Sequence, residues 1–210
     1  GSQVYLIEAV HGIMPKEDRD AAEIVEQQML RDGVKLLCCG KDLKVNKIAE
    51  GKRLTVDSHG QQYDVTVDEI VVGAGRTPNV EGIGLEAVAV EYDKNGVKVN
   101  ERLQTTNPMI FAAGDICSRY KFTHAADAMA QIVIQNALFP HPFGFGYASV
   151  ESLIMPWCTF TEPEVAHVGM YEKDAKEKGL EVETYTFKLD EVDRAILDGE
   201  SEGFARVHIQ

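Results

Sequence analysis

The sequence predicts an α/β fold for most of the chain and an α+β fold for its C-terminal part, and three patterns support this. Residues 4–38 show a strand–helix–strand order, which is the crossover unit of a parallel sheet. Two later apolar runs, 69–75 and 109–115, each lead into glycine, as strands do at the ligand-binding edge of an open α/β sheet. From residue 149 onward, short strand patterns surround one charged helical stretch.

The composition is that of a globular protein without a nucleic-acid or membrane partner. Its 210 residues suggest one or two domains, and 44% of them are hydrophobic and 26% charged. The formal charge of −13 argues against nucleic acid and anionic membrane surfaces as partners. No apolar run approaches the length of a transmembrane helix, and the N-terminus lacks a signal-peptide pattern, so we expect a cytoplasmic protein.

The cysteines form no recognised pair by their spacing. Cys38 and Cys39 are adjacent, Cys117 and Cys158 are isolated, and neither Cys-x-x-Cys nor Cys-x4-Cys occurs. The spacing therefore predicts neither a zinc site nor a redox dithiol. We expect scattered buried thiols in a reducing compartment.

The first predicted elements are a strand at Val4–Ile7, a helix from Pro15 to Asp32 and a strand at Val34–Cys38. Apolar residues of the helix recur at spacings of three and four, so they share one face, and Gly33 ends it. Residues 41–67 then alternate between apolar and polar with breaks at Gly51 and 58–60, which predicts a small antiparallel meander. Residues 70–75 are expected to return to the parallel sheet.

The second apolar run, Met109–Ala113, follows a proline and predicts a buried strand that ends in Gly114-Asp115. A helix is expected from Ala125 to Leu138. The amides at its N-terminus would face the same edge as Asp115 and suit an anion or an electron-rich carbonyl. The alternative, taken on this pair alone, is a solvated aspartate in a turn.

The remaining elements are predicted from short patterns. Residues 82–92, 97–100 and 104–115 are expected to belong together, with a turn at 93–96. Phe139–Tyr147 is rich in proline, glycine and aromatic residues and predicts a loop that its aromatic side chains anchor. The C-terminal part is expected to have strands at 153–157, 164–168, 182–189 and 203–210, and a helix at 171–178 that Gly179 ends.

Three motifs, in this order and spacing, resemble the FAD-dependent pyridine nucleotide–disulfide oxidoreductase family, which includes dihydrolipoamide dehydrogenase, glutathione reductase and mercuric reductase. They are a strand into Gly73-Ala74-Gly75-Arg76-Thr77-Pro78-Asn79, the stretch Thr105–Ile116, and the stretch Pro156–Gly169. The resemblance implies partial doubly wound, Rossmann-like NAD- and FAD-binding domains and a partial dimerisation domain. It places the C-terminal part of the NAD domain at 1–75, the returning part of the FAD domain at 76–148 and the first part of the interface domain at 149–210.

The resemblance also implies residues at the FAD edge. Asp115 would accept a hydrogen bond from a ribityl hydroxyl of FAD, and Phe122, Thr123, His124 and Ala125 would lie against the isoalloxazine. A helix N-terminus there would stabilise negative charge on reduced flavin. Residues 121–127 resemble mercuric-reductase-like members more than dihydrolipoamide dehydrogenase, and His124 is not expected to be a catalytic base.

Four further residues are implied at the NAD side. Glu8 ends a strand, at the position where family members have the acidic residue that binds the NAD ribose. No Arg or Lys precedes Lys16, so NAD is favoured over NADP. The alternative is a strand-end acid that faces water. Val45 would flank the adenine or be an ordinary core residue. Gly75 would lie near the nicotinamide nucleotide, and Arg76 would lie near the cofactors or pair with a carboxylate.

The implied activity is transfer of a hydride from NAD(P)H through FAD to a disulfide or related small-molecule acceptor. The sequence has no Cys-x4-Cys, no Gly-x-Gly-x-x-Gly and no His-Pro-x4-Glu, so we expect an inactive internal fragment that forms a homodimer through 149–210. Lipoamide, glutathione, mercuric ion and quinones all stay open as acceptors. The alternatives are a stand-alone binding or oligomerisation module, and an FAD/NAD reductase of another class without a cysteine pair; Thr161-Glu162-Pro163-Glu164 speaks against the latter.

Overall fold

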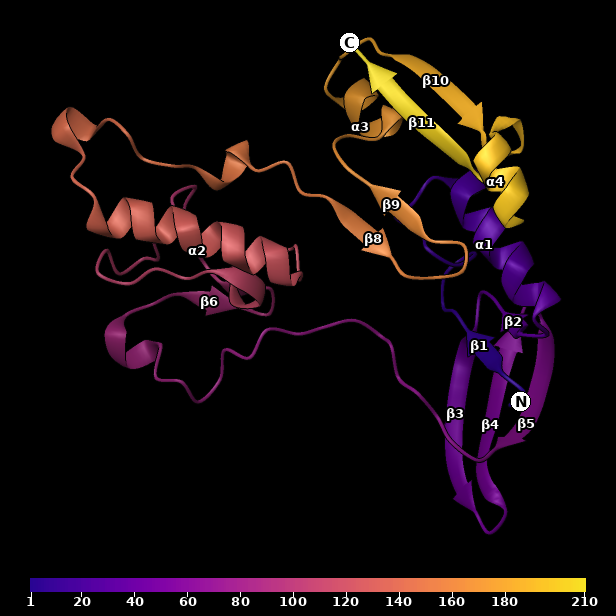
Figure 1. Cartoon of the computed structure of the whole chain (residues 1–210). Helices are drawn as coiled ribbons and strands as arrows, with labels where there is room; N and C mark the ends of the chain where they lie inside the picture. Colours follow the sequence, from indigo (N-terminus) through magenta and orange to yellow (C-terminus); the bar gives the residue numbers. More distant parts are fainter. The chain divides into compact units, whose positions relative to one another are not determined.

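A computed structural model describes all 210 residues and divides them into two compact units (Figure 1). Unit 1 comprises Gly1–Val72 together with Cys158–Gln210, and unit 2 comprises Gly73–Trp157. The domain boundaries expected at residues 75 and 148 stay predictions. None of the helices reaches both the length and the apolar character that crossing a membrane requires.

Unit 1 opens with the predicted strand–helix–strand unit. β1 (Tyr5–Ile7) and β2 (Lys35–Leu37) pair in parallel, and α1 (Arg19–Arg31) connects them. The helix begins at Arg19 and not, as expected, at Pro15. Met14 has a left-handed backbone with φ 51°, and it accepts a turn hydrogen bond at 3.0 Å from the N–H of Glu17, so a helix cannot run through this segment.

The meander is present as predicted, in the strands β3 (Lys41–Ile48), β4 (Gly51–Ser58) and β5 (Gln61–Val67). They pair antiparallel in the order β3-β4-β5, and the central strand β4 buries Leu54 and Val56. Burial is concentrated there because the central strand has neighbours on both sides. The strand expected at 70–75 is not formed. Val71 is 95% exposed and Val72 82%, because β1 and β2 pair only with each other and no strand lies beside this run.

The C-terminal part of unit 1 follows the predicted order closely. It contains the antiparallel pairs β8 (Trp157–Thr159) with β9 (Val165–His167) and β10 (Glu183–Lys188) with β11 (Phe204–Ile209). α3 (Glu172–Glu177) connects the two pairs, and a short 3₁₀ turn, η5 (Leu189–Glu191), and α4 (Asp193–Asp198) connect β10 to β11. The expected strand at 153–157 is displaced to β8.

Polar contacts join the C-terminal strands of unit 1 to the start of α1. Arg206 on β11 donates to Asp18 at 2.9 Å and also to Asp20, and its hydrogen bond lowers the pKa of the Asp20 carboxyl. The Tyr171 hydroxyl, at the start of α3, donates to the Glu17 carboxylate. These contacts link residues 17–20 to segments far along the chain, so they hold the two parts of unit 1 together.

The Tyr171–Glu17 contact gives a prediction about alkaline stability. Burial, and then the hydrogen bond to Glu17, raise the pKa of Tyr171 above its ordinary value of 10.0. Because the folded-state pKa is the higher one, this contribution is complete below pH 10 and is lost as pH rises beyond it. We expect Tyr171→Phe to lower the free energy of unfolding by about 1–2 kcal/mol at neutral pH. It should also reduce the loss of stability above pH 10.

The measurement is urea unfolding, followed by circular dichroism, at neutral pH and above pH 10. Tyr63→Phe is the matched control, because the Tyr63 hydroxyl bonds only Gln61 on its own strand, at 3.2 Å. The assigned contact would be contradicted if the Tyr171→Phe chain were as stable as the unsubstituted chain at neutral pH and lost the same free energy of unfolding above pH 10.

Unit 2 has little regular structure apart from one long helix. α2 (Thr123–Leu138) begins two residues before its predicted start and ends as expected. The short strands β6 (Tyr92–Asp93) and β7 (Gly96–Val97) flank the predicted turn, and 3₁₀ turns lie at η1 (Glu86–Val88), η2 (Gly114–Ile116), η3 (Pro142–Gly144) and η4 (Val150–Ser152). The core consists of two small clusters, whose buried members are Val80, Val90 and Val97 in one and Leu103, Met129 and Ile132 in the other.

Two expectations for unit 2 were wrong. Met109–Ala113 is not a buried strand: Met109 is 86% exposed and only isolated bridges such as Gln104↔Phe111 occur, because no continuous neighbouring strand pairs with it. The aromatic residues of the 139–147 loop do not generally anchor it, since Phe143 is 97% exposed. The exception is Tyr147, whose ring stacks on His141 with centroids 3.8 Å apart.

Candidate functional site

The Gly114-Asp115 pair forms the centre of a site in unit 2, on the turn η2 that precedes α2. Gly114 is buried with φ 80°, and a Cβ added there would lie 3.0 Å from the Ala126 Cβ. Its N–H donates to the sulfur of Met129 at 3.4 Å. The close approach that this glycine permits is therefore to α2, and it sets Asp115 beside the beginning of that helix.

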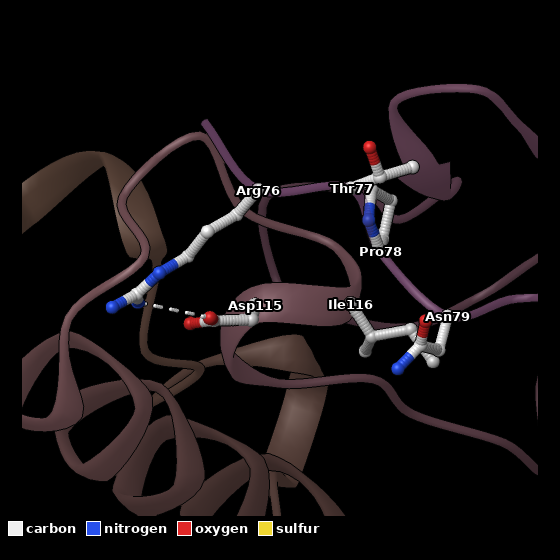
Figure 2. Close-up of a pocket in the computed structure, with 6 residues that line it drawn as sticks. All are labelled: Arg76, Thr77, Pro78, Asn79, Asp115 and Ile116. Carbon is white, nitrogen blue, oxygen red and sulfur yellow. Dashed lines mark ion pairs between the residues drawn. The ribbon is translucent and has the colours of Figure 1, made fainter. Parts of the chain in front are cut away.

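Asp115 and Arg76 form an ion pair in the lining of an open cavity of about 430 Å³ (Figure 2). The Arg76 guanidinium lies 3.5 Å from the Asp115 carboxylate, and the two side chains are 68% and 50% exposed. Such an exposed pair adds little to stability, so both groups can exchange partners at low cost. The other lining residues are Thr77, Pro78, Asn79 and Ile116.

A second cation lies beside the cavity and was missed by the sequence analysis. Lys121 donates through Nζ to the backbone oxygen of Asp115 at 2.8 Å and to that of Ser118 at 3.2 Å. Arg76 in turn donates to the backbone oxygen of Lys121 at 2.8 Å. The signal available in the sequence was a lysine immediately before the aromatic start of a helix. With Arg76 and Lys121 beside one carboxylate, the local charge is positive although the chain is strongly acidic.

The predicted residues at the start of α2 are adjacent, but they differ in exposure. Phe122 precedes the helix, and no side chain caps its N-terminus. The Phe122 and His124 rings stack with centroids 5.3 Å apart, and a His124 ring nitrogen lies 2.7 Å from the backbone oxygen of Pro156. Ala125 is fully buried, whereas Thr123 and His124 are exposed. His124 is thus held by a ring contact and a backbone contact.

The cysteine nearest this site is an unreactive thiol. Cys117 follows η2, and its sulfur lies 3.6 Å from the backbone oxygen of Gly114. Burial raises the pKa of the Cys117 thiol to about 11, so it is protonated at neutral pH. All four cysteines are free, and each is partly exposed, so the expectation of buried thiols was wrong.

The residues predicted at the NAD side fall partly in the other unit. Glu8 follows β1 in unit 1, where one of its carboxylate oxygens accepts from the N–H of Val10 at 3.2 Å. Val45 on β3 is 51% exposed opposite Leu54. Gly75, with φ 93°, has open space where a Cβ would lie, and it leads to Arg76 in unit 2. The structure therefore groups Arg76, Asp115 and the start of α2, while Glu8 and Val45 belong to unit 1.

Comparison with known proteins identifies the family. Residues 1–130 match the family described as "Pyridine nucleotide-disulphide oxidoreductase", and residues 155–210 match its dimerisation domain. This chain belongs to the pyridine nucleotide–disulphide oxidoreductase family. The predicted family and its mixed fold, with a Rossmann-like region and a dimerisation domain, are thereby confirmed. Members of this family use FAD and NAD(P)H, in agreement with the predicted cofactors of the parent enzyme.

Individual relatives agree with this family. A mercuric reductase of Staphylococcus aureus is 32% identical over 97% of this chain and 36% of its own length. A dihydrolipoyl dehydrogenase of Thermus scotoductus is 30% identical over 99% of this chain and 44% of its own length. Among solved structures, the HOCl-induced flavoprotein disulfide reductase RclA of Escherichia coli superposes with a TM-score of 0.83 at 25% identity, covering the whole chain and 47% of RclA. This chain therefore spans less than half the length of these relatives.

Proposed function

We propose that this chain is a segment of a cytoplasmic flavoprotein that passes a hydride from NADH through FAD to a disulfide or related thiophilic acceptor. The observation that carries the proposal is the cavity of Arg76 and Asp115 beside the start of α2. It unites two family motifs that lie far apart in the sequence. The acceptor class rests on the family and on the relatives, which include a mercuric reductase and dihydrolipoyl dehydrogenases.

The side chains of unit 2 fit part of a flavin nucleotide. The Asp115 carboxylate, half exposed, is an acceptor for a sugar or ribityl hydroxyl, and the Arg76 guanidinium suits a phosphate oxygen. Thr123, His124 and Ala125 form the first turn of α2, whose N–H groups no side chain caps. These free N–H groups would favour negative charge at the ring system of the ligand, and Phe122 would lie beside that ring.

The residues proposed to contact NAD belong to unit 1 and to the segment that follows its residue 72. Glu8 lies at the carboxyl end of a parallel strand, where acids accept ribose hydroxyls, and one of its two oxygens is bonded to Val10. The half-exposed face of Val45 would cover the adenine. The open backbone at Gly75 would let a nucleotide approach closely. Bound FAD would supply the two-electron carrier between the nicotinamide and the acceptor.

The dimer partner is assigned to a second copy through an uncovered apolar face on β10 and β11. Tyr185 and Phe187 are two residues apart on β10, so they share one face of the sheet. Val207 and Ile209 lie on the same face of β11, where Val207 pairs with Tyr185 and Ile209 with Glu183. These four side chains are between 53% and 56% exposed. An apolar sheet face of this kind suits burial against another protein surface, and its place within the dimerisation-domain match favours a homodimer.

One set of preparations tests this function. The 210-residue chain and its longer parent protein are purified separately, and visible absorption and solution mass are recorded on each. We expect the parent to show a flavin band that NADH bleaches. We expect the 210-residue chain to be a colourless dimer. It should show no turnover, because it has no Cys-x4-Cys to accept electrons. A colourless parent would contradict the flavoprotein assignment.

The other outcomes bear on the segment. A stoichiometric flavin band in the 210-residue chain, bleached by NADH, would show that its own residues complete the cofactor site and would overturn the proposed inactivity. A monomeric chain at micromolar concentration would argue against the proposed β10–β11 interface. NADPH serves as the matched reductant: faster bleaching of the parent by NADPH than by NADH would contradict the role given to Glu8.

A further inference from the structure

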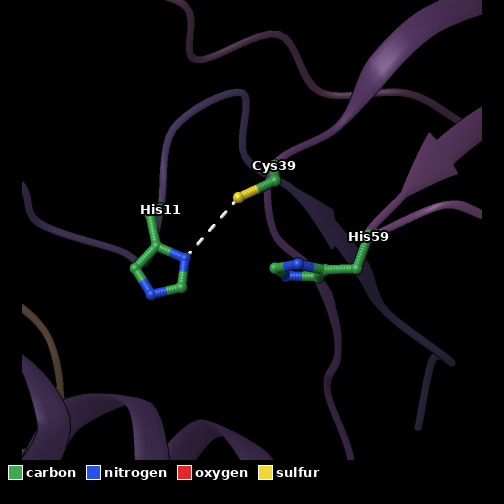
Figure 3. A group of neighbouring side chains, drawn as sticks. All are labelled: His11, Cys39 and His59. Carbon is green, nitrogen blue, oxygen red and sulfur yellow. Dashed lines mark hydrogen bonds between the residues drawn. The ribbon is translucent and has the colours of Figure 1, made fainter.

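Unit 1 brings together three metal-ligating side chains that sequence spacing did not connect: His11, Cys39 and His59 (Figure 3). Their ligating atoms all lie within 4.8 Å of one another. The Cys39 sulfur is 3.6 Å from Nδ1 of His11, and the two imidazole rings meet edge to face with centroids 6.0 Å apart. The group belongs to unit 1, whereas the Arg76–Asp115 cavity belongs to unit 2.

Backbone and side-chain hydrogen bonds hold the three turns beside each other. The turn after β1 carries His11, and the turn after β2 carries Cys39, whose N–H donates to the backbone oxygen of Val10 at 3.1 Å. The hairpin between β4 and β5 carries His59. The buried Ser58 hydroxyl beside it donates to the backbone oxygen of Cys38 at 2.5 Å. The ligand positions are therefore set by strand ends that are tied together.

The hairpin has a defined geometry that fixes His59. Ser58 pairs with Gln61, and the two residues between them, His59 and Gly60, have φ of 54° and 79°. Positive φ at both central residues is the geometry of a tight type I′ hairpin, which follows the twist of the strands. Cys39 likewise has φ 53°. Two of the three side chains thus project from left-handed positions on tight turns, and both turns continue into a glycine.

The donor set indicates the class of ion. One thiolate and two imidazoles suit a borderline or soft transition-metal ion, and they do not suit Mg²⁺ or Ca²⁺, which take oxygen ligands. In a tetrahedral zinc site with bonds of about 2.0–2.3 Å, neighbouring ligand atoms lie about 3.5 Å apart. The Cys39–His11 distance already matches this value. His59, an exposed side chain, would need to move by about 1 Å.

We propose that His11, Cys39 and His59 bind one Zn²⁺-class ion through Sγ of Cys39 and one ring nitrogen of each histidine. The fourth coordination position is left for water or an external ligand. Binding releases the Cys39 thiol proton to solvent, and no electron transfer is involved. Because both histidines are exposed, the ion enters directly from solvent. Only one cysteine takes part, so the site differs from a redox dithiol.

Cobalt titration of the reduced 210-residue chain tests the proposal, because Co²⁺ bound to a thiolate gives a sulfur-to-metal charge-transfer absorption. We expect one Co²⁺ per chain, displaced by Zn²⁺ with loss of the band. Cys39→Ser should abolish the charge-transfer band. His59→Asn should lower Zn²⁺ affinity by at least about tenfold, and asparagine tolerates the left-handed backbone, so the hairpin is retained.

Matched controls separate this site from adventitious binding. Cys38→Ser changes the adjacent thiol, which is near the backbone of Gly12. His208→Gln changes a partly exposed histidine that is bonded to Thr184. Both should keep the stoichiometry and the band, with far-UV circular dichroism confirming that every variant folds. A band that survives in Cys39→Ser or disappears in Cys38→Ser overturns the assignment. So does a chain that binds no Co²⁺.

Discussion

Under the proposed function, replacing Asp115 with alanine should lower the affinity of the longer parent protein for FAD by roughly 10- to 150-fold. The change removes a negatively charged hydrogen-bond acceptor, and hydrogen bonds to charged groups contribute about 1.5–3 kcal/mol. The fold should survive the change. Asp115 is half exposed, and its pairing with Arg76 at 3.5 Å is a surface ion pair, worth at most about 1 kcal/mol.

The measurement is FAD titration of the deflavinated parent protein, followed by flavin fluorescence, together with urea unfolding of the same preparations. Asp127→Asn is the matched control. It removes an exposed carboxylate one turn into α2, whose side-chain partner Gln131 lies 2.8 Å away on the same helix. Equal FAD affinity in the Asp115→Ala and Asp127→Asn proteins would show that Asp115 does not contact the flavin nucleotide.

Replacing Gly96 with alanine should be the most destabilising glycine-to-alanine change in unit 2. Gly96 is buried in β7 with φ 125°, and an added Cβ would lie 2.1 Å from the backbone oxygen of Ile116. The substitution causes both backbone strain and a steric overlap, and each of these costs about 1–3 kcal/mol. We expect a loss of about 4 kcal/mol in the free energy of unfolding, a large share of the stability of an ordinary domain. Because Ile116 follows Asp115 on η2, the same change should also weaken FAD binding by the parent.

Gly84→Ala isolates the backbone contribution. Gly84 has φ 80° but no atom within 4 Å of an added Cβ, so alanine there should cost only about 1–2 kcal/mol. Urea unfolding of both variants gives the comparison, and the rate at which a thiol reagent modifies Cys117, next to Ile116, reports on η2 itself. If Gly96→Ala were no more destabilising than Gly84→Ala, the close packing of β7 against η2 would be refuted.

Patterns of residues close in sequence were enough to predict most local elements and the family. Apolar periodicity and Gly33 predicted α1 and β2, the alternation of residues 41–67 predicted the meander, and the C-terminal strands were found within a few residues. These features depend on interactions between residues close in sequence, which a pattern records. The three motifs that identified the family did so because each combines a glycine with a particular polar residue at fixed spacing.

Which of the predicted strands form depends on pairing between distant parts of the chain. Residues 70–75 and Met109–Ala113 have the composition of strands, yet both are without a continuous partner, and Val71 and Met109 are exposed. Strand formation depends on hydrogen bonds to a neighbour elsewhere in the chain, and no local pattern records whether that neighbour is present.

The tertiary structure also decided which side chains meet. Arg76 comes from a segment far from Asp115 and Lys121 in the sequence, and no local pattern records that these three residues meet. His11 and His59 come together with a cysteine because the ends of β1 and β2 and one hairpin are tied by hydrogen bonds. Spacing along the chain excluded a zinc motif, but metal coordination depends on distance in space.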